Sequence, residues 1–228
     1  MPIASPRSEA GFSRSSAEGK AWRSAWMRTS RHCWAIRAEG HGAGAPQYEK
    51  ALFVGRSLTC TKTGGLHIGC FENTPQEALV NVDAILSQAG IAHVAEGDIR
   101  YRMWAKLMLN VGINQTCCAF GASYGDVYAD ETSELWRTFI SAMREVVALA
   151  QAEGVALTES DLSAYAALER TLNPASTPSM GQDCINRHRT EVDEFSGEVL
   201  RRAEKQGILV PANAFQSKRI RKIEASCL

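Results

Sequence analysis

Helix signals follow one another along the second two-thirds of this chain and leave little room for any other element there. Thr74-Pro75-Gln76-Glu77 combines an N-cap threonine, a proline at the first helical position and a glutamate that closes a capping box. Asp98 can cap a second helix, which runs from Ile99 to about Cys118. Further helices are expected over about 131–153, 158–171 and 192–206 and after Pro211. We therefore predict a mainly α protein in which residues 94–228 form one helical domain.

The first 48 residues differ in composition from the rest of the chain. They are rich in serine, arginine and glycine and show no sustained strand or helix period, so we expect them to be poorly ordered. Two short apolar runs follow, Ala51–Val54 and Leu66–Phe71, separated by the turn residues Thr61–Gly65. They predict a β-hairpin, which the first helix follows. The predicted organisation therefore has three parts, with boundaries at 1–48, 49–93 and 94–228.

Charge and hydropathy exclude several classes of protein. The 25 Lys and Arg residues balance the 25 Asp and Glu residues, so the chain offers no electrostatic footprint for nucleic acid. No apolar run approaches the ~18 residues that a membrane-spanning helix needs, and no apolar signal region follows the arginines near the N-terminus. We expect a cytoplasmic protein that binds neither nucleic acid nor membrane.

The cysteines and histidines show no pattern of a disulfide framework or a metal site. The seven cysteines are an odd number at irregular spacing, in a chain large enough to fold without disulfides, so we expect reduced thiols. No C-x-x-C pair occurs, and the five histidines lack the spacing of metal ligands. We expect no bound metal.

The most informative segment is the predicted helix around residues 100–114. Lys106, Asn110 and Asn114 recur at i, i+4 and i+8, which places them within an arc of about 80° on one face, while the other faces are apolar. Asparagine is a poor helix former, so two of them beside one lysine suggest hydrogen-bonding groups directed at a ligand in a polar cavity. In the alternative, the asparagines satisfy neighbouring main-chain groups and Lys106 reaches solvent.

A second polar cluster begins at Pro178. Ser179 follows that proline and opens a predicted helix, where a hydroxyl and main-chain N–H groups can receive a carboxylate. Glu191 lies where another helix begins. In the structural alternative, Ser179 is an N-cap and Glu191 a first-turn carboxylate that interacts favourably with the helix dipole. The residues alone leave both alternatives open.

Four motifs, taken in order, resemble the C-terminal domain of the ketopantoate reductases, also called 2-dehydropantoate 2-reductases. They are K-L-x-x-N-x-x-I-N at Lys106–Asn114, P-S-M-x-Q-D at Pro178–Asp183, R-T-E-V-D at Arg189–Asp193 and G-I-L-V-P-x-N at Gly207–Asn213. The resemblance covers roughly residues 50–222. It implies a helical domain of the 6-phosphogluconate-dehydrogenase-like type that closes over a Rossmann domain. It also implies NADPH-dependent reduction of a 2-keto acid, ketopantoate, to pantoate, on the way to pantothenate and coenzyme A.

The same resemblance implies roles for five residues, by matching position. Lys106 would donate the proton in catalysis, and Asn110, Asn114 and Ser179 would hydrogen-bond the substrate. Glu191 would bind the nicotinamide or ribose side of the cofactor. An ammonium group suits the first role, because reduction of a ketone builds an alkoxide that a cation stabilises and protonates.

The chain departs from the family pattern at two places. Tyr124 stands where some members have a further substrate-binding asparagine, which leaves the identity of the 2-keto acid open. The G-x-G-x-x-G turn that opens the family's cofactor domain has one weak counterpart, Gly40–Ala45, with no buried strand before it and no βαβ unit around it. We therefore interpret residues 49–93 as the remnant of a truncated Rossmann domain and expect NADPH binding to be weak or absent.

Two functions are compatible with this sequence. One is a 2-dehydropantoate 2-reductase, impaired by truncation, whose partner is a small 2-keto acid. The other is a non-catalytic helical module derived from that family, which binds a keto acid weakly or forms a homodimer. Consumption of NADPH in the presence of ketopantoate separates the two.

Overall fold

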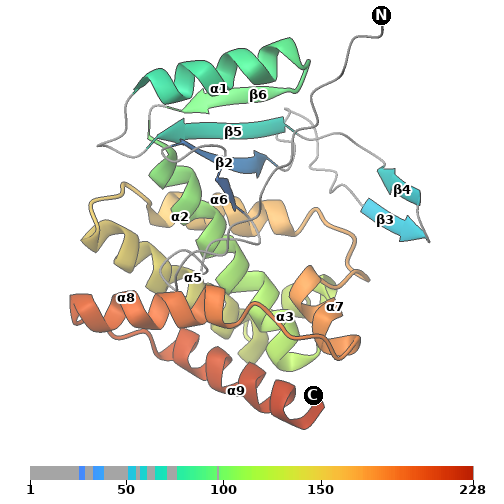
Figure 1. Ribbon diagram of the computed structural model, residues 1–228. Coiled ribbons are helices and arrows are strands. Elements are labelled where there is room, and N and C mark those ends of the chain that lie inside the picture. Colours follow the sequence, from blue (N-terminus) through green and yellow to red (C-terminus); the bar gives the residue numbers. More distant parts are fainter. Residues whose placement is uncertain are drawn as a thin grey trace, which may run out of the picture.

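A computed structural model describes residues 26–28, 33–38, 51–54, 57–60, 65–70, 76–96 and 98–227. A small β-sheet with one helix adjoins a larger helical part, and helix α2 leads from the first to the second (Figure 1). This arrangement confirms the predicted mainly α fold with a small β portion.

The larger sheet has four strands in the order β1-β2-β5-β6. These strands are Trp26–Arg28, Cys33–Ala38, Gly65–Cys70 and His93–Glu96. β5 and β6 run parallel, whereas the β1–β2 and β2–β5 pairs are antiparallel. Parallel neighbours need a crossover connection, and α1 (Gln76–Gln88) provides it. α1 lies beside β6 and β5 in Figure 1, so the three elements form one βαβ unit.

Strand pairing corrects the predicted hairpin. Ala51–Val54 (β3) pairs with Ser57–Cys60 (β4) in a separate two-stranded sheet, and does not pair with the strand that begins at Gly65. The reason is separation along the chain, because residues 55–56 alone join β3 to β4 and a short link favours a local antiparallel pair. β5 takes its partners from β2 and, through α1, from β6.

β1 and β2 lie in the segment 1–48, for which we expected no regular element. All six residues of β2 pair with β5, from Cys33 opposite Cys70 to Ala38 opposite Gly65. Main-chain pairing with a strand that is distant in sequence leaves little trace in local periodicity, so these strands were not predicted. The other residues of 1–48, and with them the expected poor order, lie outside the described residues.

The helical part follows the predicted succession of helices, with two interruptions. Its elements are α2 (Ile99–Leu109), the π turn η2 (Asn110–Asn114), α3 (Gln115–Phe120), α4 (Tyr124–Tyr128), α5 (Glu134–Ala152), α6 (Glu159–Glu169), α7 (Ser179–Ile185), the π turn η3 (Asp193–Gly197), α8 (Glu198–Gln206) and α9 (Pro211–Cys227). The helix predicted over 99–118 contains η2, and the helix predicted over 192–206 begins as η3. Within the described ranges, no helix has both the length and the apolar character needed to cross a bilayer.

The core forms around α5, whose residues Phe139, Met143 and Val146 are fully buried. η2 packs closely against this helix at Gly112. A Cβ atom at this position would lie 2.5 Å from Met143 Cγ and 3.1 Å from a ring carbon of Phe139. A residue without a side chain is therefore required for the approach of η2 to α5.

A carboxylate of α5 caps the first turn of α9. Glu145 accepts hydrogen bonds from the main-chain N–H groups of Ala212 and Asn213, at 2.7 and 2.9 Å, and from Asn213 Nδ2 at 2.8 Å. These contacts satisfy main-chain donors that the first turn of a helix leaves unpaired. Asn213, which ends the G-I-L-V-P-x-N motif, therefore has a structural role in joining α9 to α5.

Candidate functional site

α2 begins at the carboxyl end of the parallel strand pair. Asp98 caps the helix by accepting the main-chain N–H of Arg100 at 2.9 Å, as the sequence predicted. Glu96, the last residue of β6, accepts from Arg102 Nε at 2.9 Å and also pairs with His67 of β5. These contacts hold the first turn of α2 against the sheet edge where ligands commonly bind in open α/β folds.

The predicted polar stripe of α2 continues from this edge into the helical part. Lys106 is partly buried, Asn110 is 7% exposed and Asn114 is partly buried. The other faces of α2 are covered, because Met103, Trp104, Ala105, Leu107, Met108 and Leu109 are all buried. The stripe is therefore the polar side of an otherwise apolar helix, as its sequence pattern indicates.

A π turn changes the geometry of this stripe. In η2 the main-chain N–H of Gln115 donates to the carbonyl of Asn110, five residues back, and Asn114 Nδ2 donates to Asn110 Oδ1 at 3.4 Å. A π turn holds more residues than an α turn, so each residue advances by a smaller angle around the axis. Asn114 is thereby turned back toward the direction of Lys106. The predicted arc assumed a regular α-helix, and η2 departs from that assumption.

Ser179 is the first residue of α7, and its side chain is exposed. The N-cap is Pro178, so the alternative in which Ser179 serves as the N-cap is wrong. Proline has no side-chain oxygen, so α7 has no side-chain cap. Ser179 lies one residue past the cap position, and its hydroxyl does not cap the helix. α7 packs against both α3 and η2, which brings Ser179 onto an element next to the two asparagines.

The loop before α7 is held on α4. The main-chain N–H of Tyr124 donates to the carbonyl of Ser176 at 3.0 Å, and that of Gly125 donates to Pro174 at 2.8 Å. A Cβ atom on Gly125 would lie 2.9 Å from the Pro174 carbonyl oxygen, so glycine permits this contact. Tyr124 is thus part of the anchor that positions the loop leading to Ser179.

Glu191 is a half-buried carboxyl two residues before η3, whose N-cap is Val192. Its carbonyl accepts the main-chain N–H of Phe195 at 3.0 Å. Burial, and then the negative charges of Asp183 on α7 and of Glu194, raise the pKa of the Glu191 carboxyl to about 7. A carboxyl with a pKa near neutrality is present in both its charged and its protonated form at neutral pH, and the protonated form can donate as well as accept a hydrogen bond.

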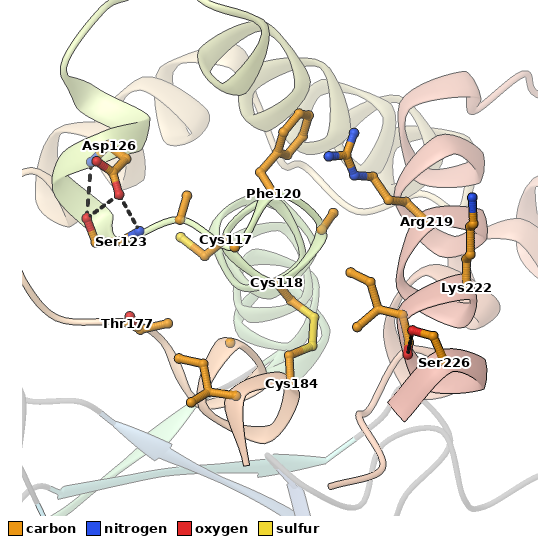
Figure 2. A pocket seen from close by; sticks show the side chains of 16 residues that line it. Cys117, Cys118, Phe120, Ser123, Asp126, Thr177, Cys184, Arg219, Lys222 and Ser226 are labelled. Atoms are coloured by element: carbon orange, nitrogen blue, oxygen red, sulfur yellow. Dashed lines mark hydrogen bonds between the residues drawn. A yellow bond between two sulfur atoms is a disulfide. The ribbon is translucent and has the colours of Figure 1, made fainter. Parts of the chain in front are cut away.

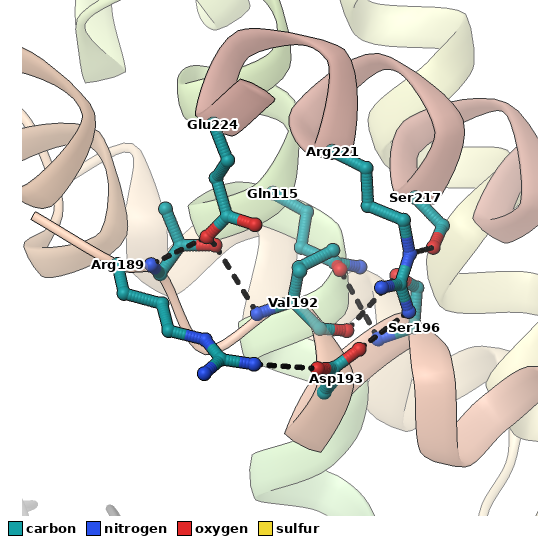
Figure 3. Close-up of polar contacts among 9 residues, drawn as sticks. Gln115, Arg189, Val192, Asp193, Ser196, Ser217, Arg221 and Glu224 are labelled. Atoms are coloured by element: carbon teal, nitrogen blue, oxygen red, sulfur yellow. Dashed lines mark hydrogen bonds and ion pairs between the residues drawn. The ribbon is translucent and has the colours of Figure 1, made fainter. Parts of the chain in front are cut away.

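The other residues of the R-T-E-V-D motif attach this segment to α9 (Figure 3). Thr190 donates from its main-chain N–H and its hydroxyl to Glu224, at 2.7 and 2.8 Å. Asp193 accepts from Arg189 at 3.5 Å and pairs with Arg221 of α9. The motif thus fixes the backbone on both sides of Glu191.

The structure places four of the five predicted site residues on or beside three elements that meet at η2. Asn110 and Asn114 form its ends, α7 with Ser179 packs against it, and η3, which follows Glu191, contacts it as well. Lys106 lies one helical turn before Asn110 on α2. That the five side chains share one substrate site stays a prediction. Among the described residues, no group of three or more His, Cys, Asp or Glu residues could hold a metal ion.

Stability is expected to fall as the pH rises through the titration of Glu191. The folded pKa is about 7 and the ordinary value is 4.5, so the folded protein binds more protons between these values than the unfolded chain. The stabilisation that proton binding at Glu191 provides is fully present below the ordinary pKa and is lost as the pH rises through the folded pKa. For a partly exposed carboxyl we expect about 1–2 kcal/mol. Denaturant unfolding of Glu191→Gln at about pH 5 and about pH 8 should show a smaller difference than the wild type. An equal difference in both proteins would contradict the assignment.

A pocket of about 830 Å³ surrounds the C-terminal end of α3 (Figure 2). Its walls come from α3, α4, α7 and α9, and it is lined by Cys117, Phe120, Thr177, Gly181, Arg219 and Lys222 among others. None of the five predicted site residues lines it. The pocket is therefore not the site that the sequence predicted.

A disulfide in this pocket corrects the expectation of reduced thiols. Cys118 of α3 is bonded to Cys184 of α7, across 66 residues of sequence, with the two Cα atoms 6.3 Å apart. Sequence spacing could not reveal the pair, because only the packing of α7 on α3 brings the two residues together. Cys117, next to Cys118, is a buried thiol outside this bond, and burial raises its pKa to about 12. Protonated, buried thiols of this kind are unreactive.

Comparison with known proteins supports the resemblance seen in the sequence. Residues 98–224 match the family model described as "Ketopantoate reductase PanE/ApbA C terminal". The chain is 30% identical over 149 residues to a 2-dehydropantoate 2-reductase of Streptococcus pyogenes serotype M1, a match that covers 65% of this chain and 48% of the relative. The chain thus spans about half the length of the curated relatives it matches.

Solved structures agree on the fold. A PanE/ApbA family ketopantoate reductase from Ralstonia eutropha JMP134 aligns with a TM-score of 0.68 and 26% identity, over 84% of this chain and 59% of that one. A dimeric ketopantoate reductase from Staphylococcus aureus also aligns with a TM-score of 0.68, at 20% identity, over 85% of this chain and 62% of that one. The second likeness shows the fold alone.

Proposed function

Because this chain belongs to the ketopantoate reductase family, we propose that it carries the substrate-binding and proton-donating part of a 2-dehydropantoate 2-reductase. That enzyme reduces ketopantoate, a 2-keto acid, to pantoate with NADPH, in the synthesis of pantothenate and coenzyme A. The observation that carries the proposal is the polar stripe of Lys106, Asn110 and Asn114 on an otherwise buried helix, next to the sheet edge. The chain covers about half the length of its curated relatives. The activity of the whole enzyme is therefore a proposal for this chain and does not follow from the similarity alone.

Lys106 is the proposed proton donor. Reduction of a ketone places negative charge on the carbonyl oxygen, and an ammonium group beside it stabilises that charge and then supplies the proton. Lys106 is partly buried, so its charge is less screened by water than that of a surface lysine. Asn110 and Asn114, which hydrogen-bond each other, offer further amide groups to the hydroxyl or carboxylate of the substrate.

Ser179 and Glu191 complete the proposed site. Ser179 presents an exposed hydroxyl at the start of α7 as a substrate contact. Glu191, with its raised pKa, is proposed to contact the nicotinamide side of the cofactor, where a protonated carboxyl can donate a hydrogen bond. Both assignments come from matching positions in the family motifs.

The sequence that links the parallel strands to α1 does not fit the phosphate groups of a dinucleotide. Such groups bind at a glycine-rich turn between a parallel strand and a helix. The segment between β5 and α1, Phe71-Glu72-Asn73-Thr74-Pro75, lies outside the described residues, and its sequence contains no glycine. The candidate turn Gly40–Ala45 lies outside the described residues. We therefore assign no step of the reaction to a cofactor held by this part of the chain.

That mismatch favours a second candidate function, a non-catalytic module that binds a keto acid or forms a homodimer. The related S. aureus enzyme is described as dimeric, which makes a homodimer of this chain a reasonable proposal. We propose the cytoplasm as the compartment for either function. A reducing compartment would keep Cys118 and Cys184 as thiols, so the oxidation state of this pair in protein isolated from cells bears on the compartment.

Removing the Lys106 side chain is expected to weaken ketopantoate binding about tenfold or more, since the carboxylate and the carbonyl lose their cation. Calorimetric titration of the full chain with ketopantoate measures this for the wild type and for Lys106→Ala. Arg144→Ala is the matched control, because Arg144 is an exposed cation on α5 that pairs with Glu159.

A second assay separates the two candidate functions. Loss of NADPH absorbance in the presence of ketopantoate, abolished by Lys106→Ala, would establish the enzyme. Ketopantoate binding that depends on Lys106 without NADPH consumption would favour the binding module. Equal affinity of the wild type and Lys106→Ala would refute the proposed site.

A further inference from the structure

One buried side chain, that of Gln115, connects the two π turns. Its Oε1 accepts the main-chain N–H of Ser196 in η3 at 3.1 Å, and its Nε2 donates to the carbonyl of Val111 in η2 at 3.3 Å. Gln115 and Ser196 are both fully buried. Figure 3 shows Gln115 reaching toward Ser196 across the space between the two segments.

Each π turn leaves one main-chain group without its usual helical hydrogen-bond partner, and Gln115 contacts both of these groups. In η3, Gly197 donates its main-chain N–H to Val192, five residues back, at 2.9 Å. In an α-helix that carbonyl would accept the N–H of Ser196, which here donates to Gln115 instead. In η2, the N–H of Gln115 donates to Asn110 in the same way, and the carbonyl of Val111 receives the Gln115 side chain.

Two more buried polar residues fix the orientation of the Gln115 amide. Nε2 also donates to Gln216 Oε1 of α9 at 3.2 Å, and Gln216 Nε2 donates to Thr116 Oγ1 at 2.8 Å. Gln216 and Thr116 are fully buried as well. A buried network in which each member has partners specifies one arrangement, because any shift leaves a polar group unpaired.

We propose that Gln115 is a positioning residue for the substrate site. Its side chain pairs with the one main-chain group in each π turn that lacks its usual helical partner, and it thereby holds η2 and η3 together. This contact fixes the position of Asn110 and Asn114 relative to Glu191. The inference rests on the proposed function for the identity of the site residues. The contacts between the two turns do not depend on it. Gln115 was not predicted as a site residue, because a glutamine one residue beyond the K-L-x-x-N-x-x-I-N motif carries no local signal.

The test compares Gln115→Met, which keeps the length of the side chain and removes its hydrogen bonds, with Gln115→Glu. A buried, protonated glutamate keeps an acceptor for Ser196 and one donor. Asn213→Leu is the matched control, since Asn213 is a fully buried amide whose bonds go to α5 and not to either π turn. The readouts are the Glu191 pKa, from carboxyl NMR signals of the full chain, and the affinity for ketopantoate.

In Gln115→Met we expect the Glu191 pKa to move from about 7 toward its ordinary 4.5, because η3 loosens and the carboxyl gains water. We also expect ketopantoate binding to weaken about tenfold, because displaced Asn110 and Asn114 side chains would lose hydrogen bonds to the ligand. Gln115→Glu should restore both properties. Asn213→Leu should lower the unfolding temperature without changing either.

Three other outcomes also test the positioning role of Gln115. If Gln115→Met is destabilised like Asn213→Leu but leaves the Glu191 pKa and the affinity unchanged, Gln115 is only structural and the proposal is overturned. If the wild type does not bind ketopantoate, the proposed function fails, and the Glu191 titration alone decides the positioning role. If Gln115→Met does not fold, Gln216→Leu, which removes the outer bond, should give a smaller shift of the same sign. No shift in that variant would overturn the proposal.

Discussion

NADPH added to this chain in a calorimeter is expected to show no binding in the low micromolar range. A dinucleotide gains much of its affinity from its pyrophosphate and 2′-phosphate groups, through charge-assisted hydrogen bonds worth about 1.5–3 kcal/mol each. The described residues offer one parallel strand pair, and the sequence between its first strand and the following helix contains no glycine, so the glycine-rich pattern that holds these groups is missing there. Loss of several such bonds weakens binding by about a thousandfold or more.

A fragment of the cofactor provides the control for this prediction. If Glu191 contacts only the nicotinamide end, nicotinamide mononucleotide and NADPH should bind with similar, weak affinities. Ketopantoate titrated into the same sample shows that the protein is folded and competent. A low micromolar dissociation constant for NADPH, well below that of the fragment, would contradict the prediction and would direct attention to a phosphate site in residues 1–50.

Reduction of the Cys118–Cys184 disulfide is expected to lower the free energy of unfolding by about 4 kcal/mol. The bond closes a loop of 66 residues, and the chain-entropy relation for a loop of that length gives this value. The loop contains α4, α5 and α6, so its closure limits the unfolded chain more than a short loop would. Denaturant unfolding with and without a thiol reductant measures the difference.

Two cysteine variants identify the source of that effect. Cys184→Ser should have the lower stability from the start and should not respond to the reductant. Cys117→Ser, which changes the buried free thiol next to Cys118, should respond as the wild type does. A wild-type midpoint that is the same in both conditions, together with two titratable thiols at these positions, would show that the pair is reduced, as the sequence alone suggested.

The helices illustrate what can be predicted from the sequence of this protein. The cap at Asp98 and the start of α6 at Thr158 depend on residues within one turn of each other, so their signals lie side by side in the chain. The buried faces of α2 and its polar stripe follow from a period of 3.6 residues. The four motifs likewise identified the family, because each of them is a short local pattern.

Other features arise only where segments distant in sequence meet. The hairpin prediction failed because β5 pairs with β2 and, through a crossover helix, with β6, and local periodicity does not choose between partners. The Cys118–Cys184 bond depends on the packing of α7 on α3. The raised pKa of Glu191 depends on burial and on Asp183 of another helix.

The candidate site combines features that follow from local sequence with features that depend on the tertiary structure. The residue types of the stripe, Lys106, Asn110 and Asn114, and their helical spacing were evident from the sequence. The helix geometry between Asn110 and Asn114 was decided by a π turn, which leaves the carbonyl of Val111 without its usual main-chain partner. The Gln115 side chain donates to that carbonyl, and its amide is oriented by Ser196 of η3 and Gln216 of α9, which only the tertiary structure brings next to it.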